Sequence, residues 1–269
     1  MDSPGEKLAV FRERRNLAAV QPQGPLALVN TQWIDMEQTV WGVPGLWAPS
    51  PNGVGLQLTA SADAGITVDG QLVDGSVDVH AKGTNSPSDV VLSDTQVAHV
   101  IAQGDSCALR VWDSNSEGIQ AFGEIDAFEY APQWVITGSW KEIPGGKSVG
   151  FEHLKDEGVS RDEVIPGEIS ITYDGQDYTL AAFKAGTALQ LVFADATNDV
   201  STYSVGRFLF VAPNPDGTIT LDFNYAVLPP CAFSYAFNCP LPPAQNRFPF
   251  AIEAGEKNVM KADGSLLHG

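Results

Sequence analysis

The chain has 269 residues, of which 43% are hydrophobic, and its 33 acidic and 15 basic residues give a formal net charge of -18. The apolar fraction is enough for a sizeable core that needs no disulfide or metal to fold. The negative charge repels phosphate groups, so nucleic acid and anionic membrane surfaces are not expected partners.

The N-terminal residues and the cysteines bear on location. No apolar run approaches the ~20 residues of a membrane span. The first arginines follow the first apolar residues, whereas a signal peptide has the opposite order. An odd number of cysteines, three in all, is typical of a reducing compartment. We therefore expect a cytoplasmic protein.

A short amphipathic helix is predicted over residues 6–20, before Pro22 and Gly24. Apolar and charged residues alternate there at helical spacing, the apolar ones being Leu8, Phe11, Leu17 and Val20 and the charged ones Glu6, Arg12, Glu13 and Arg15.

From residue 40 onward, short runs rich in Val, Ile, Thr, Phe and Tyr are separated by Gly, Asn, Asp and Pro. Asp69-Gly70 and Asp174-Gly175 lie between alternating flanks and predict tight hairpins. Residues 109–113 also resemble residues 191–195, which indicates an internal repeat. We expect an all-β protein, sandwich or barrel-like, with a helical lead-in (1–30) and two related β halves (31–130 and 131–269).

Six prolines lie within residues 229–249, which can form neither a central strand nor a helix. We expect an extended loop that packs through its aromatic side chains. Phe248 and Phe250 are expected to form an exposed apolar rim. The oligomeric state is open, a homodimer included.

The segment Gly146–Gly150 matches the G-x-S-x-G pattern of hydrolases, with Ser148 at the nucleophile position. That motif needs a strand before it and a helix after it, and no βαβ pattern surrounds it. Lys141 stands where a phosphate-binding P-loop needs its first glycine, so that motif is rejected. A hairpin loop is the favoured interpretation.

No metal or cofactor is predicted, because the four histidines are not paired at helical spacing. Cys231 and Cys239 are further apart than the two to four residues, roughly, that separate paired zinc ligands. They are expected either to form a disulfide or to remain two buried thiols that anchor the Pro-rich loop.

The strongest group of polar residues lies between residues 195 and 256. Its members are Asp195, Thr197, Tyr203, Arg207, Asp222, Asn224, Asn246, Arg247 and Glu256. Asp222 and Asn224 lie two apart and so share a strand face, and Arg207 and Arg247 are their expected partners. The group is either a buried network that holds the Pro-rich loop or a pocket for a small polar or anionic ligand, and structural ion pairs of this kind are common.

At these residues the sequence resembles the bacterial and archaeal "domain of unknown function 1684" family. The resemblance rests on Asp222-Phe-Asn224, Pro229-Pro-Cys-Ala232, Cys239-Pro-Leu-Pro-Pro243 and Ala254-Gly-Glu256, in this order. It covers residues 191–257 closely and extends more weakly towards the N-terminus. It implies the same site residues and no particular activity. Trp112 stands where an arginine is common, so no basic site is expected in the first half.

The leading functional hypothesis is a small-ligand-binding protein with its site in the second half. Arg207 and Arg247 would hold an anion, Asn224 and Asn246 would hydrogen-bond it, and Tyr203 would line the wall. The first alternative is a hydrolase with Asp195, Asp222 or Glu256 as general base and an arginine as oxyanion stabiliser. The second is an interaction protein without a pocket.

Overall fold

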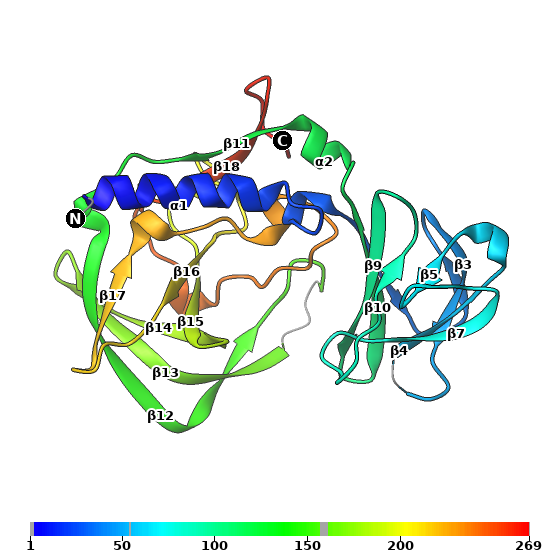
Figure 1. Ribbon diagram of the computed structural model, residues 1–269. Coiled ribbons are helices and arrows are strands. Elements are labelled where there is room, and N and C mark those ends of the chain that lie inside the picture. Colours follow the sequence, from blue (N-terminus) through cyan, green and yellow to red (C-terminus); the bar gives the residue numbers. More distant parts are fainter. Residues whose placement is uncertain (1–2, 54, 157–160, 269) are drawn as a thin grey trace. The chain divides into compact units, whose positions relative to one another are not determined.

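The computed structural model describes residues 3–53, 55–156 and 161–268, and these are mostly antiparallel β-sheet with a helix at the N-terminus (Figure 1). The all-β prediction with a short N-terminal helix and a Pro-rich C-terminal loop is therefore confirmed. None of the described helices is both long enough and apolar enough to cross a membrane.

The chain divides into two compact units. The first, called here the split unit, comprises Met1–Asn16, Phe122–Phe233 and Asn238–Gly269. The second, the inserted unit, comprises Leu17–Ala121 with Ser234–Phe237. Most of the helical lead-in thus shares a unit with the C-terminal strands, and the division into halves at residue 130 stays a prediction.

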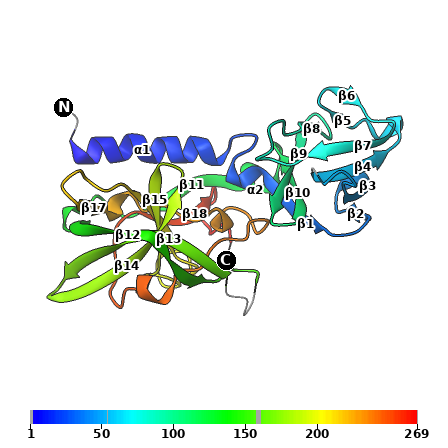
Figure 2. The same cartoon turned by 90° about the horizontal axis from the view of Figure 1, so that it is seen from below.

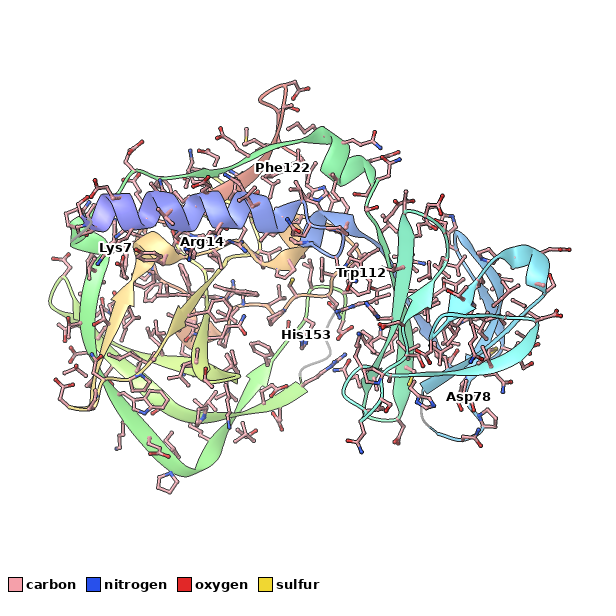
Figure 3. The ribbon with its side chains drawn as sticks, in the orientation of Figure 1. Lys7, Arg14, Asp78, Trp112, Phe122 and His153 are labelled. Carbon is pink, nitrogen blue, oxygen red and sulfur yellow. The ribbon has the colours of Figure 1, made fainter. Side chains whose placement is uncertain are left out.

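Helix α1 (Pro4–Ala19) starts with a capping box. The Ser3 amide donates to the Glu6 carboxylate at 2.6 Å, the Glu6 amide donates to the Ser3 hydroxyl, and Pro4 occupies the first turn. The backbone hydrogen bond from Ser3 lowers the pKa of Glu6. Leu8 is buried as expected, but Leu17 is exposed, so the predicted apolar face is correct only in part. Lys7 and Arg14 are also exposed (Figure 3).

The inserted unit holds two antiparallel sheets, ordered β1-β10-β9-β8-β5-β6 and β2-β3-β4-β7 (Figure 2). Its strands are β1 (Leu28–Ile34), β2 (Gln38–Val40), β3 (Val43–Pro49), β4 (Gly55–Ala60), β5 (Thr67–Val68), β6 (Gln71–Leu72), β7 (Gly75–His80), β8 (Val90–Val91), β9 (Gln96–Gln103) and β10 (Ser106–Asp113), followed by the short helix α2 (Glu117–Ala121). Trp47 and Leu58 from the smaller sheet pack with Val100 and Leu109 from the larger one in one core. Alternating apolar side chains account for this two-sheet packing.

The split unit is built on a curved six-stranded sheet, a half-barrel, ordered β16-β15-β14-β13-β12-β17. Its strands are β12 (Val135–Phe151), β13 (Arg161–Tyr173), β14 (Gln176–Ala185), β15 (Ala188–Phe193), β16 (Arg207–Val211) and β17 (Thr218–Asp222), and a separate pair joins β11 (Phe122–Ala127) to β18 (Glu256–Lys261). Side chains alternate between two cores, so that Leu191 and Phe193 lie in one and Val192 lies in the other.

Both predicted hairpins are present. Asp69 and Gly70 have φ angles of 52° and 77° between β5 and β6, and Asp174 and Gly175 have 48° and 74° between β13 and β14. Positive φ at both central residues is what this class of two-residue turn requires.

Ser148 lies inside strand β12, where it pairs with Val164 of β13. The predicted hairpin loop at Gly146–Gly150 is wrong, because the two glycines at 145 and 146 take positive φ and are absorbed as an irregularity within β12. No strand-to-helix turn surrounds Ser148, so the nucleophile-elbow reading has no structural support.

Candidate functional site

Arg207, at the start of β16, lies in the interior of the split unit with 0% of its surface exposed. Its guanidinium donates to Asp195 Oδ2 at 2.7 Å and to the carbonyl oxygens of Ile252 and Ala254. The group also lies 5.2 Å from the ring centroid of Phe193. Burial lowers the pKa of Arg207, whereas the neighbouring Asp195 raises it.

Gly206 allows the start of β16 to lie close enough to β15 for Arg207 to reach these partners. Its φ is +115°, and a Cβ atom there would lie 2.5 Å from the carbonyl oxygen of Phe193. A side chain at this position would therefore push β16 away from β15 and move Arg207 off its partners.

Asp195 is the centre of the network. Besides Arg207, its carboxylate accepts from the Thr197 amide and hydroxyl and from the Ile252 amide, at 2.6 to 3.1 Å. The buried carboxylate thus accepts four hydrogen bonds in all, and hydrogen bonds to a charged group are among the strongest in proteins. The pair fixes the loop after β15 to the segment before β18.

Asp222 does not pair with either arginine, which corrects the predicted partnership. Its Oδ1 accepts from the Asn224 backbone and side-chain amides, at 3.1 and 2.8 Å, because the chain turns into a 3₁₀ helix after β17. Asn224 then bonds both backbone groups of Ala131. Arg247 is exposed.

Asn246 is fully buried, and its side-chain amide forms hydrogen bonds with backbone groups of the sheet. Its Oδ1 accepts from the Ala181 amide, and its Nδ2 donates to the carbonyl oxygens of Ala181 and Val192, all at 2.8 to 2.9 Å. Asn246 therefore links the Pro-rich loop to β14 and β15.

Glu256 links helix α1 to the strands of the split unit. Its two carboxylate oxygens accept from Arg15 Nε and Nη2, at 2.7 and 3.0 Å, and Oε2 also accepts from the Leu228 amide at 2.7 Å. The three carboxylates proposed as general bases are thus each held by internal donors.

The remaining predicted residues anchor the loop. The Tyr203 hydroxyl donates to the Cys231 carbonyl at 3.1 Å, and the Cys231 amide donates to Cys239 Sγ at 3.1 Å. Both cysteines are buried, and a disulfide between them stays a prediction. Phe248 is buried in the aromatic core with Phe250 packed against it, so the predicted exposed rim is wrong.

Apart from the exposed Arg247, these polar residues are engaged in internal hydrogen bonds, and those of Tyr203 and Asn246 hold the Pro-rich loop. None of them lines the cavity of the split unit described next. Sequence reasoning therefore identified the network and missed the cavity.

A cavity of about 220 Å³ lies where strands β13 and β14 diverge. Strand β14 pairs with β13 from Gln176 to Ala182 and with β15 from Phe183 onward. Pro166 lies at this point of β13, and because proline has no amide donor, the ladder to β14 ends there. The sequence signal for the cavity is this proline within an otherwise regular strand.

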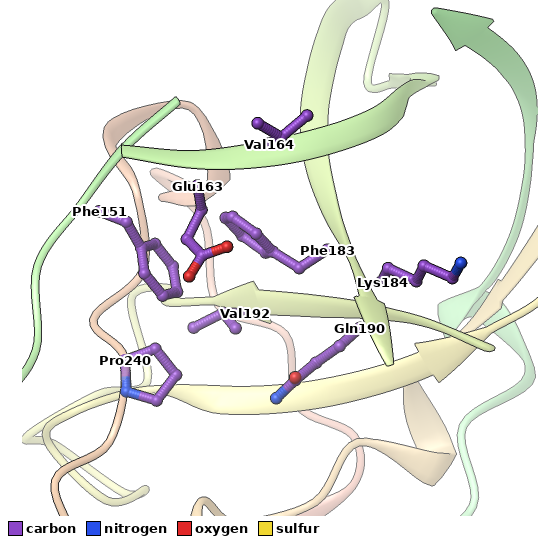
Figure 4. A pocket seen from close by; sticks show the side chains of 8 residues that line it. All are labelled: Phe151, Glu163, Val164, Phe183, Lys184, Gln190, Val192 and Pro240. Atoms are coloured by element: carbon purple, nitrogen blue, oxygen red, sulfur yellow. The ribbon is translucent and has the colours of Figure 1, made fainter. Parts of the chain in front are cut away.

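The cavity has an apolar floor and a polar mouth (Figure 4). Its lining residues are Phe151, Glu163, Val164, Phe183, Lys184, Gln190, Val192 and Pro240. Figure 4 shows the Glu163 side chain on the same side as the rings of Phe151 and Phe183, whereas the side chains of Val164 and Lys184 point away. The two rings are 4.4 Å apart, centroid to centroid.

The Pro-rich loop closes one side of the cavity. Pro240 lies between two backbone hydrogen bonds to the segment after β12, Leu154 to Cys239 at 2.9 Å and Leu241 to Glu152 at 2.8 Å. Next to it, His153 packs edge-on against Phe151. Burial lowers the pKa of His153, as does Arg161, whereas Asp156 and Glu163 raise it.

Within residues 3–53, 55–156 and 161–268, no group of three or more histidine, cysteine, aspartate and glutamate side chains is arranged to hold a metal ion. The donor set of the cavity, one carboxylate and one amide above aromatic rings, is suited to an organic ligand.

Comparisons with known proteins give a family and a structural relative. The family model described as "Protein of unknown function (DUF1684)" matches residues 120–257. An uncharacterized protein of Haloarcula marismortui, solved by NMR in solution, is 29% identical over 51% of this chain and 77% of its own, with a TM-score of 0.42. No curated protein is significantly similar to the chain.

Proposed function

Because the chain belongs to the family described as "Protein of unknown function (DUF1684)", which assigns no activity, we propose a function from geometry: the split unit binds a small molecule in the cavity beside Pro240. The proposal keeps the small-ligand function predicted from sequence. It moves the site from Arg207, whose guanidinium is already used internally, to the floor formed by Phe151, Phe183 and Val192.

The cavity itself is the observation that carries the proposal. Small-molecule sites in proteins are typically concave pockets lined by apolar and aromatic side chains with a few polar groups, and this cavity, open to solvent on one side, has Phe151, Phe183 and Val192 buried at its base. An apolar cavity of roughly 150 Å³ is enough to bind benzene. The volume of about 220 Å³ therefore accommodates one ring with a short polar head group.

The walls support a preformed rather than an induced site. They come from β12, β13, β14 and β15, and the loop wall at Pro240 is held by backbone hydrogen bonds on both sides. Rigid walls lower the ordering cost of binding, which favours recognition of a small ligand.

The test is a titration of the full chain with benzyl alcohol, a neutral single-ring probe, followed by amide chemical shifts in NMR spectra. We expect saturable shifts at Phe183, Gln190 and Val192, with a Kd of roughly a millimolar for so small a probe. Gln190→Trp, which fills the mouth, should abolish them.

Gln176→Trp is the matched control, because Gln176 is an exposed glutamine on the same pair of strands, outside the cavity. It should leave binding unchanged. Shifts spread over the whole surface, or equal effects of the two tryptophan variants, would overturn the proposal.

The finer expectations from sequence stay predictions. The hydrolase and the interaction protein without a pocket are alternatives that no contact of the network favours. A cytoplasmic location, the absence of nucleic-acid partners and a homodimer are likewise untested.

A further inference from the structure

Glu163 alone is acidic among the described residues that line the cavity. It lies on β13, opposite Val149 of β12, at the part of β13 that no longer pairs with β14. Glu163 is exposed, and its side chain lines the cavity beside the rings of Phe151 and Phe183 (Figure 4). The side chain is thus placed where the polar end of a bound molecule would lie.

In the described residues, the basic groups near Glu163 form no salt bridge with it. Arg161 forms its ion pair with Asp156, and the Lys184 side chain points away from the cavity. His153 has a lowered pKa, caused first by burial and then by Arg161, which favours its neutral form near pH 7. Within the described part of the chain, no hydrogen bond or salt bridge reaches the Glu163 carboxylate.

A ligand with a positively charged nitrogen would satisfy this arrangement. The cation would pair with the carboxylate and lie near the face of a phenylalanine ring, which attracts positive charge. The net charge of -18 attracts cations to the whole molecule and repels anions. An anionic ligand would instead face Glu163 directly.

We infer that the molecule bound here is a small organic amine, with an apolar body on Phe151, Phe183 and Val192 and its ammonium group at Glu163. The inference rests on the proposed function, because it assigns a ligand class to that same cavity. It assigns a cationic ligand, whereas the sequence predicts a small polar or anionic one.

The experiment compares three probes with the same ring, namely benzylamine, benzyl alcohol and benzoate, at pH 7 and low salt. We expect benzylamine, which is protonated at this pH, to bind roughly five- to thirtyfold more tightly than the alcohol, and benzoate more weakly than either. High salt should reduce the preference for the amine, because ions screen an exposed charge pair.

Glu163→Gln should remove the preference for benzylamine and leave the affinity for benzyl alcohol unchanged. Asp162→Asn is the matched control, since it removes the same charge from the neighbouring exposed residue, which does not line the cavity. It should retain most of the preference.

The outcomes separate the two proposals. If benzyl alcohol and benzylamine bind equally well to the wild-type chain and to E163Q, the amine assignment is overturned and the binding site stands. If neither probe binds, both proposals fall. If E163Q and D162N lose the preference to the same extent, long-range charge accounts for it and Glu163 does not recognise the ligand.

Discussion

The guanidinium of Arg15 and the carboxylate of Glu256 form a two-pronged ion pair between residues 241 positions apart in the chain. Arg15 lies on α1 and Glu256 begins β18, and the side chain of Glu256 is only 3% exposed. This ion pair attaches the helix to strands β11 and β18. The Asn16 side chain, which accepts a hydrogen bond from the Ile125 amide, adds a second attachment. The geometry of the ion pair is the one in which arginine pairs with carboxylate most strongly.

Removal of this attachment should loosen α1. Arg15→Gln should cost about 1–3 kcal/mol of unfolding free energy, because charged hydrogen bonds are lost from a half-buried site. Glu256→Ala should cost about 3–5 kcal/mol, because it also leaves the buried Leu228 amide without its acceptor. Urea unfolding and hydrogen exchange at the Leu228 amide measure both effects.

The control for this pair is Arg14→Gln, which removes an exposed arginine from the same helix (Figure 3). It should change stability by less than about 0.5 kcal/mol. Equal effects of the Arg14 and Arg15 variants would show that the ion pair does not stabilise the helix.

Arg207 and Arg247, the two arginines that the sequence suggests as anion ligands, should differ strongly in their response to substitution. Arg207→Met leaves the buried Asp195 charge without its partner and should destabilise the split unit by about 3–5 kcal/mol. Arg247→Met removes an exposed arginine and should have almost no effect. Calorimetry of the two variants is the measurement, and a stable Arg207→Met protein would contradict the network described here.

Stability should rise as the pH rises from about 5 to 7. Burial lowers the folded-state pKa of His99 and of His153 below the ordinary value, 6.5. The unfolded chain then binds more protons than the folded chain in this pH range. The stabilisation that comes from the two neutral histidines is therefore fully present above pH 6.5 and is lost as the pH falls. His153→Asn should reduce the slope of unfolding free energy against pH, and an unchanged slope would exclude His153 as a source.

The two loop thiols should join without rearrangement of the fold. The hydrogen bond with Cys239 lowers the pKa of Cys231, against the effect of burial, and so increases its thiolate fraction. Treatment with diamide, an electrophilic thiol oxidant, should yield one Cys231–Cys239 disulfide, detected by peptide mapping. Cross-links that involve Cys107 instead would contradict this expectation.

Local patterns predicted local structure well. The Asp-Gly pairs at 69 and 174 identify their turns because few residues tolerate positive φ there, and the helix at residues 6–20 follows from spacing and stop signals. The burial of the Pro-rich loop follows from its aromatic residues. These inferences need only a few neighbouring positions.

Long-range partners were harder to predict. An arginine at the start of an apolar strand, such as Arg207, indicates a buried partner but not which one. Asp222 was expected because it lies on a strand, whereas Asp195 is the partner because the loop after β15 folds back onto Ile252. The cavity was missed for the same reason, since it depends on how β13 leaves β14 at Pro166.

In the sequence, most of α1 comes before the inserted unit and the remainder of the split unit comes after it, and this order affects biosynthesis. Ribosomes add roughly 5–20 residues per second, so Glu256 is made about 12–50 seconds after Arg15. A single helix of 16 residues is only marginally stable in water, so α1 has no lasting structure during that interval. The strands between Leu28 and Asp113 are complete much sooner, so most of the inserted unit can fold while the nascent helix still waits for its partner.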